Sequence, residues 1–220
     1  MNVLERLKKY QDADYLKFNS KLIPGIKSIG VKTPYLKEIA KELVKNNELS
    51  FFNESHLYHE EWMIHMYMLS FIKDKEIVYK ELDKIVPIIN NWAMCDSLMN
   101  IKLIKKNREY FYKLINKYKK SNNEFEIRFV MVMLLNHYMD INYLKDTFNI
   151  LDNTDTDKYY SRMAMSWLLA ECIIHFRTET FNYLNNTKVD DWTFNKAIQK
   201  ACESFRVSDE DKILLKSMKR

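Results

Sequence analysis

Apolar residues recur three or four positions apart along most of the chain, in blocks separated by short polar links. The first 30 residues hold helical segments, and the pattern is interrupted by Pro24, Gly25 and Gly30. Thr33 and Pro34 then indicate a new helix, with Thr33 as its cap and Pro34 in its first turn. The pattern predicts further helices over 34–46, 57–72, 74–89, 91–106, 107–119, 123–138, 140–151, 157–175, 177–185, 190–204 and 208–219.

Glycine is scarce, and this decides the fold class. The 220 residues include two glycines and three prolines, where average usage gives about 15 and 11. Only one proline and no glycine follow Pro34. Because sheet proteins need glycine at hairpin turns, we predict an all-α fold. The links between the helices are short, so we expect a single domain over residues 1–220.

Two kinds of helix alternate in the pattern. Apolar-rich segments, which we expect to be inner helices, are separated by more charged ones, and they are centred near Met66, Met131 and Leu168. Trp92, Arg128 and Trp167 follow each other at intervals of 36 and 39 residues. This period is typical of stacked antiparallel helix pairs of the HEAT or armadillo type. An irregular helical bundle is the alternative.

Composition narrows the class of protein further. No stretch approaches the roughly 20 apolar residues of a membrane span, and the N-terminal residues are charged throughout, so we expect a cytoplasmic protein. Cys95, Cys172 and Cys202 lie far apart and form no CxxC motif, which predicts three packed thiols.

Positive charge gathers in the middle of the chain. The net charge is +5, which alone does not indicate a nucleic-acid partner. Between Lys102 and Lys120, however, eight basic residues accompany a single acid, Glu109. Such a run fits either a solvated helix face or a DNA-binding surface.

Three polar positions stand out against apolar surroundings. Trp92 and Asp96 are four residues apart, and so are Trp167 and Glu171, so each pair lies on one helix face. Arg128 is the only charge in IRFVMVMLL, residues 127–135. Because an isolated buried charge is costly, we expect these charged groups to lie near one another. They either join neighbouring helices as a structural ion pair, or line a groove that receives a nucleotide.

The segment HEEWMIH resembles a zinc motif only superficially. Its histidines, His59 and His65, are six residues apart and fall on different helix faces, so we expect no metal site. Two glycines also leave no room for a standard phosphate-binding loop, and we expect no cofactor.

Several segments together resemble the DNA alkylation repair family, the HEAT-like alkylpurine DNA glycosylases. The resemblance covers nearly the whole chain, and it rests on IPGIKSIGVKTPYLKEIAK, the WxxxD of Trp92 and Asp96, IRFVMVMLL with Arg128, AMSWLLAE with Trp167, and NKAIQKACESFRVS. Their order and spacing carry more weight than any one motif.

The resemblance implies a right-handed superhelix of stacked helix pairs whose concave, basic face binds duplex DNA. It implies a monofunctional glycosylase that excises cationic N3- and N7-alkylated purines without drawing the damaged base into a pocket. By this resemblance Asp96 is the catalytic carboxylate, Trp92 and Trp167 flank the sugar and phosphate of the lesion, and Arg128 holds Asp96 or a phosphate. Active members carry an acid where this chain has Ala93.

The residue types suit this chemistry. A cationic alkylpurine is already a good leaving group, so the enzyme must mainly stabilise the oxocarbenium-like sugar and place a water. An ionised carboxylate serves both purposes, and aromatic faces favour the developing cation. We expect a monomer that binds phosphates through basic residues, and the candidates are Lys102, Lys105, Lys106, Lys196, Lys200 and Arg206.

Two other functions fit the same architecture. A non-catalytic DNA-structure binder would bind duplex or branched DNA in a salt-dependent way and release no base. A helical repeat that binds peptides would have no affinity for DNA even at low salt.

Overall fold

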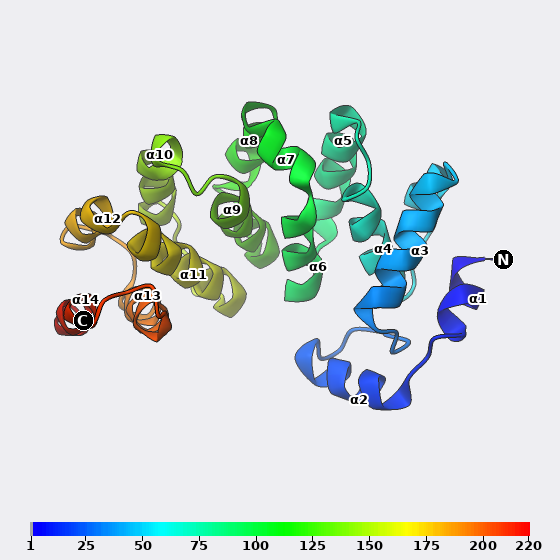
Figure 1. Cartoon of the computed structure of the whole chain (residues 1–220), viewed down its shortest axis with the longest axis horizontal. Coiled ribbons are helices and arrows are strands. Elements are labelled where there is room, and N and C mark those ends of the chain that lie inside the picture. The colour runs from blue at the N-terminus through cyan, green and yellow to red at the C-terminus, as the bar shows by residue number, and fades with distance from the viewer. Residues whose placement is uncertain (1) are drawn as a thin grey trace. The chain divides into compact units, whose positions relative to one another are not determined.

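The computed structural model describes residues 2–220, and every regular element in that range is a helix (Figure 1). The all-α prediction is confirmed for this part of the chain. Contacts divide the chain into two compact units, residues 1–107 and 108–220, and each is described by itself. The expectation of one continuous repeat domain stays a prediction.

The first unit is built around one buried helix. Helix α4 has ten of its eleven residues buried, and α3 and α6 pack against it. It is the inner helix that the apolar segment around Met66 predicted. The elements of this unit are α1 (Val3–Lys8), α2 (Ala13–Leu22), α3 (Thr33–Lys45), the 3-10 helix η1 (Leu49–Asn53), α4 (His59–Leu69), α5 (Lys75–Ile85), η2 (Val86–Ile88), α6 (Trp92–Ser97), η3 (Leu98–Asn100) and α7 (Lys102–Lys106).

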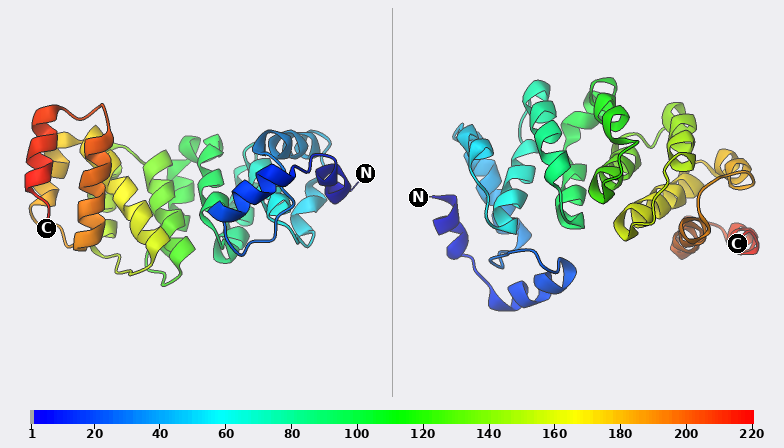
Figure 2. Two further views of the ribbon diagram at one scale, coloured as in Figure 1. Left: turned by 90° about the horizontal axis from the view of Figure 1, so that it is seen from below. Right: turned by 180° about the vertical axis from the view of Figure 1, so that it is seen from behind.

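The second unit stacks three inner helices side by side, and α11 lies between α9 and α13 (Figure 2). Outer helices pack onto them, with α8 against α9, α12 against α11 and α14 against α13. This is the arrangement of stacked helix pairs that the spacing predicted. The elements are α8 (Arg108–Tyr118), α9 (Glu124–His137), α10 (Ile141–Asp152), α11 (Tyr159–His175), α12 (Arg177–Leu184), α13 (Asp191–Glu203) and α14 (Asp209–Ser217).

The segment 91–106 is not the single helix that the apolar pattern predicted. It consists of α6, η3 and α7, and the buried residue Ile101 has a non-helical backbone between the last two. The Ser97 hydroxyl donates to the Met94 carbonyl, and the Asn100 amide donates to the Ser97 carbonyl. Polar side chains that bond nearby carbonyls compete with the helical ladder, and periodicity alone does not reveal this.

Thr33 does not cap its helix as predicted. It is the first residue of α3, and the cap position falls on Lys32, which makes no side-chain capping bond. The Thr33 side chain instead lines a cavity that Tyr67 on α4 also lines. Pro34 does lie in the first turn, where its missing N–H has no helical partner to lose.

The cysteines are free thiols, with Cys95 and Cys172 buried and Cys202 partly exposed. Within residues 2–220, no helix combines the length and the apolar character that a bilayer crossing needs.

Candidate active site

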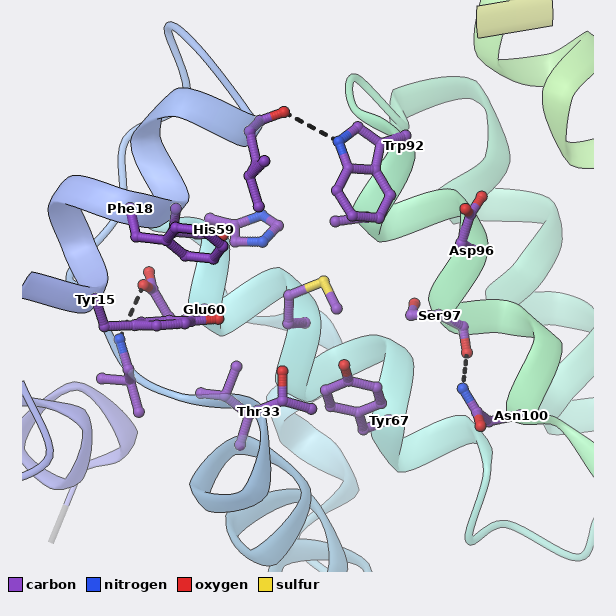
Figure 3. A pocket seen from close by; sticks show the side chains of 16 residues that line it. Tyr15, Phe18, Thr33, His59, Glu60, Tyr67, Trp92, Asp96, Ser97 and Asn100 are labelled. Atoms are coloured by element: carbon purple, nitrogen blue, oxygen red, sulfur yellow. Dashed lines mark hydrogen bonds between the residues drawn. The ribbon is translucent and has the colours of Figure 1, made fainter. Parts of the chain in front are cut away.

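The candidate catalytic pair lies on helix α6. Asn91 starts this helix, because its side chain accepts a hydrogen bond from the Met94 N–H at 3.0 Å. Trp92 and Asp96 follow one turn apart, and each is partly exposed. Both side chains line one cavity (Figure 3).

This cavity lies between α2, α4 and α6 in the first unit, and we call it the α2 cavity. Its volume is about 300 Å³. Aromatic rings from α2, α4 and α6 line it, together with polar and aliphatic side chains (Figure 3). The residues that matter here are Tyr15 and Phe18 from α2, His59 and Tyr67 from α4, and Trp92 and Asp96 from α6.

Trp92 is fixed by the end of helix α2. Its indole N–H donates to the Leu22 carbonyl at 3.0 Å, across 70 residues of sequence. The bond satisfies a carbonyl that the helix end leaves free, and it holds the ring at the rim of the α2 cavity. The orientation of Trp92 therefore depends on where α2 lies.

Glu60 holds the loop that places α2. The side chain is buried on α4, and its carboxylate accepts hydrogen bonds from the N–H groups of Ile29, Gly30 and Val31 at 2.9, 2.7 and 3.3 Å. The Gly30 carbonyl in turn accepts from the Asp12 N–H at the start of α2. Glu60, part of the segment that superficially resembles a zinc motif, thus has a structural role.

Gly30 is the point where this loop and α2 approach each other most closely. Its φ is +91°, and a Cβ there would lie 2.6 Å from the Leu16 Cβ. We expect Gly30→Ala to lower the free energy of unfolding of the first unit by about 2 kcal/mol, through backbone strain and overpacking. Urea unfolding measures this loss.

Gly25→Ala is the matched control for this substitution. Gly25 also has a positive φ, +79°, but no atom lies within 4 Å of its ideal Cβ position. Gly25→Ala should lower the free energy of unfolding by about 1 kcal/mol, through backbone strain alone. Equal losses in the two variants would mean that the contact with Leu16 has no energetic consequence.

His59 is a site residue that sequence reasoning missed. It is 6% exposed and lines the α2 cavity, and its Nδ1 has no hydrogen-bond partner among the described residues. Burial lowers the pKa of its imidazole. The ring is therefore neutral at pH 7 and can offer one donor and one acceptor nitrogen.

Two lysines lie beside the α2 cavity. A groove of about 370 Å³, which we call the lysine groove, is lined by Lys37 and Lys102 and shares Tyr67 and Asn100 with the cavity. The Lys37 ammonium lies 5.2 Å from the centre of the Tyr67 ring. Lys102 is one of the predicted phosphate contacts, whereas Lys37 escaped prediction because it belongs to an amphipathic helix far from the basic run.

The remaining predicted lysines are on the surface. Lys105 and Lys106 are exposed on α7 in the first unit. Lys196 and Lys200 are partly exposed on α13 in the second unit, and the Lys196 ammonium donates to Gln199 at 3.1 Å. Their contact with phosphate stays a prediction.

Arg128 and Trp167 lie in the second unit, on the adjacent inner helices α9 and α11. Arg128 is buried and donates from Nη1 to the Tyr160 carbonyl at 3.2 Å, while Trp167 is partly exposed. Trp92 and Asp96 belong to the first unit. The convergence of all four residues on one groove stays a prediction.

Glu171 forms a pair that the sequence did not suggest. Both of its oxygens accept from the Arg206 Nη2 at 3.0 Å, and the His175 Nε2 lies 3.3 Å from one of them. The sequence pattern groups Glu171 with Arg128 and Asp96, and it makes Arg206 a candidate phosphate contact. In the structure Glu171 forms an ion pair, and its partner is Arg206.

Two further histidines, His56 and His65, contact each other away from the α2 cavity. The His56 Nε2 is 2.9 Å from the His65 Nδ1, and the His65 Nε2 is 3.5 Å from a Glu81 oxygen. Glu61 accepts from the N–H groups of Leu57 and Tyr58, which caps α4. Across residues 2–220, no group of three His, Cys, Asp or Glu side chains has the geometry to hold a metal ion.

The sequence of the chain matches the profile of one protein family over residues 3–201, almost its whole length. That family is described as "DNA alkylation repair enzyme". The chain belongs to the DNA alkylation repair enzyme family. A search of curated proteins gives no match.

Membership in the DNA alkylation repair enzyme family confirms the resemblance drawn from the sequence. It gives the chain a role in the repair of alkylated DNA, as an enzyme. The segments on which the resemblance rested include Trp92 and Asp96 at the α2 cavity and the loop that Glu60 holds.

Proposed function

We propose that the chain is a monofunctional DNA glycosylase that excises cationic N3- and N7-alkylated purines from duplex DNA. The observation that carries this proposal is the pairing of Trp92 and Asp96 on one face of α6, at an aromatic cavity beside two lysines. A carboxylate next to aromatic faces suits a reaction in which positive charge moves from the base to the sugar.

The proposed reaction needs little acid catalysis, because the cationic purine leaves as a neutral base. As the glycosidic bond lengthens, charge develops on the sugar, and the Asp96 carboxylate stabilises it. The same carboxylate can accept a proton from the water that attacks the anomeric carbon. The products are the free base and an abasic site with an intact strand.

A base-release assay tests this function. Purified protein should release N7-methylguanine and N3-methyladenine from methylated duplex DNA faster than spontaneous loss, and strands should break only after alkali. Salt-dependent duplex binding without base release would favour the non-catalytic DNA binder. Absence of DNA affinity at low salt would favour the peptide-binding repeat.

The lysine groove should bind phosphate in this complex. We expect the double substitution Lys37→Ala, Lys102→Ala to weaken duplex binding and to reduce the salt dependence of the binding constant. Each lost phosphate contact lowers the slope of log K against log salt by about 0.9. Titration of a labelled duplex at several salt concentrations measures both effects.

A matched pair of lysines controls for net charge. Lys45 and Lys80 are exposed residues outside the lysine groove. The double substitution Lys45→Ala, Lys80→Ala should leave the salt slope unchanged. If both double variants lose the same amount of affinity, the groove has no special role in binding DNA.

A further inference from the structure

The C-terminal end of α11 carries a charged cluster on the same side as Trp167. Glu171 follows Trp167 by one helical turn, so the two side chains project from one face of α11. Arg206 reaches this face from the loop between α13 and α14, and its Nη2 donates to both Glu171 oxygens at 3.0 Å. The His175 Nε2 lies 3.2 Å from the Arg206 Nη1 and 3.3 Å from a Glu171 oxygen. A guanidinium is thus held beside the turn of α11 that follows Trp167.

The cluster is open to solvent and does not belong to the core. The side chains of Arg206 and His175 are 41% and 46% exposed, and that of Glu171 is 22% exposed. The Arg206 Nε makes no hydrogen bond to any described residue. Ion pairs between partly exposed side chains contribute little to stability. The guanidinium can therefore leave Glu171 for another anion at little cost.

A DNA phosphate is the anion that suits this guanidinium. An arginine fork pairs with two oxygens of a phosphate as it does with those of a carboxylate. Phe205, the residue before Arg206, is 94% exposed, so the loop presents a ring and a cation together. The DNA backbone alternates deoxyribose and phosphate, which offers an apolar contact to the ring and an anion to the guanidinium. Because the chain belongs to a DNA repair family, duplex DNA is the matching polyanion.

We propose that Arg206 binds a phosphodiester of duplex DNA and that Glu171 occupies its guanidinium until DNA arrives. Each phosphate contact of Arg206 must then displace a carboxylate, which lowers the affinity for any duplex. Glu171 thereby limits how strongly undamaged DNA holds the enzyme. The proposal rests on the proposed glycosylase function and adds a residue that adjusts its DNA binding.

The first test is Glu171→Gln, which keeps the size of the side chain and removes its charge. Titration of a labelled, undamaged duplex should show about fivefold tighter binding, the size of an exposed ion pair. The slope of log K against log salt should grow by about 0.9, for one added phosphate contact. Glu179→Gln is the matched control, since Glu179 is exposed on the outer helix α12 of the same unit. It should leave the salt slope unchanged.

The second test adds Arg206→Gln to the wild type and to Glu171→Gln. In the Glu171→Gln background it should abolish the gain in affinity and restore the wild-type salt slope, whereas in the wild type it should change binding much less. A gain that survives the loss of Arg206 would overturn the proposal. Weaker binding by Glu171→Gln would also overturn it, because Glu171 would then position Arg206 rather than compete with phosphate. Glu171→Ala repeats the test without any acceptor, and urea unfolding shows that each variant is folded.

The outcomes separate this proposal from the function on which it rests. Undamaged duplex should inhibit base release by Glu171→Gln at a concentration about fivefold lower than for the wild type. Base release, with DNA binding that ignores both Glu171 and Arg206, would overturn the phosphate site and leave the glycosylase intact. Absence of base release would refute the glycosylase, and a gain in duplex affinity that depends on Arg206 would then still support the phosphate site.

Discussion

Asp96→Asn is expected to reduce the release of N7-methylguanine from methylated duplex DNA at least about 100-fold, while duplex binding and folding survive. The substitution keeps the size of the side chain on α6 but removes the negative charge that we assign to stabilising the sugar. Loss of one electrostatic stabiliser of a transition state typically costs 10²–10³ in rate. Single-turnover release, with enzyme in excess over DNA, measures the chemical step without interference from product release.

A charge-matched control distinguishes this effect from a general loss of negative charge. Asp157 lies outside the α2 cavity, and its side chain is 87% exposed. Asp157→Asn should release base at the wild-type rate. If Asp96→Asn retains wild-type single-turnover activity, Asp96 is not the catalytic carboxylate and the proposed mechanism fails.

Acid is expected to destabilise the first unit well before its carboxylates are fully protonated. Burial, with smaller contributions from His56 and Lys84, lowers the pKa of His65 to about 3. Its pKa in the unfolded chain is about 6.5. Between these two values the unfolded chain binds a proton that the folded chain excludes, so stability falls as the pH falls below about 6.5.

The size of this loss follows from the two pKa values. Between about pH 7 and pH 5, His65 alone lowers the free energy of unfolding by about 2 kcal/mol. Burial also lowers the pKa values of His56 and His59, which adds to the loss in the same direction. Urea unfolding at the two pH values, followed by tryptophan fluorescence, measures the difference.

His65→Gln isolates the contribution of one histidine. The variant should be less stable at neutral pH, since it disturbs a buried contact, but its loss between pH 7 and pH 5 should be about 2 kcal/mol smaller than that of the wild type. His175→Gln changes an exposed histidine on α11 and should keep the full acid loss. An acid loss in His65→Gln equal to that of the wild type would contradict the assignment.

The helices were largely predictable because local periodicity determines them. The inner helices around Met66, Met131 and Leu168 are apolar on every side, and the structure buries each of them as α4, α9 and α11. The broken segment 91–106 was missed because Ser97 and Asn100 bond to nearby carbonyls. Whether these side chains bond to the backbone depends on their geometry, and the apolar pattern does not reveal it.

The candidate site was predictable only where its parts are neighbours in sequence. Trp92 and Asp96 lie together because four residues make one helical turn. The bonds from Glu60 to the loop around Gly30, and from Trp92 to Leu22, span 30 and 70 residues. The pairing of Glu171 with Arg206 spans 35. No local pattern contains such contacts, so His59 and the apolar side of α2 became visible only in the folded chain.

The exposure of α2 also affects how easily this helix unfolds locally. Because no residue of this helix is buried, it can detach without breaching the core around α4, at a cost well below that of global unfolding. The amide hydrogens of α2 should exchange with solvent through such local openings. Those of α4 should exchange only when the whole first unit unfolds. Deuterium uptake over residues 13–22 should therefore be faster than uptake over residues 59–69.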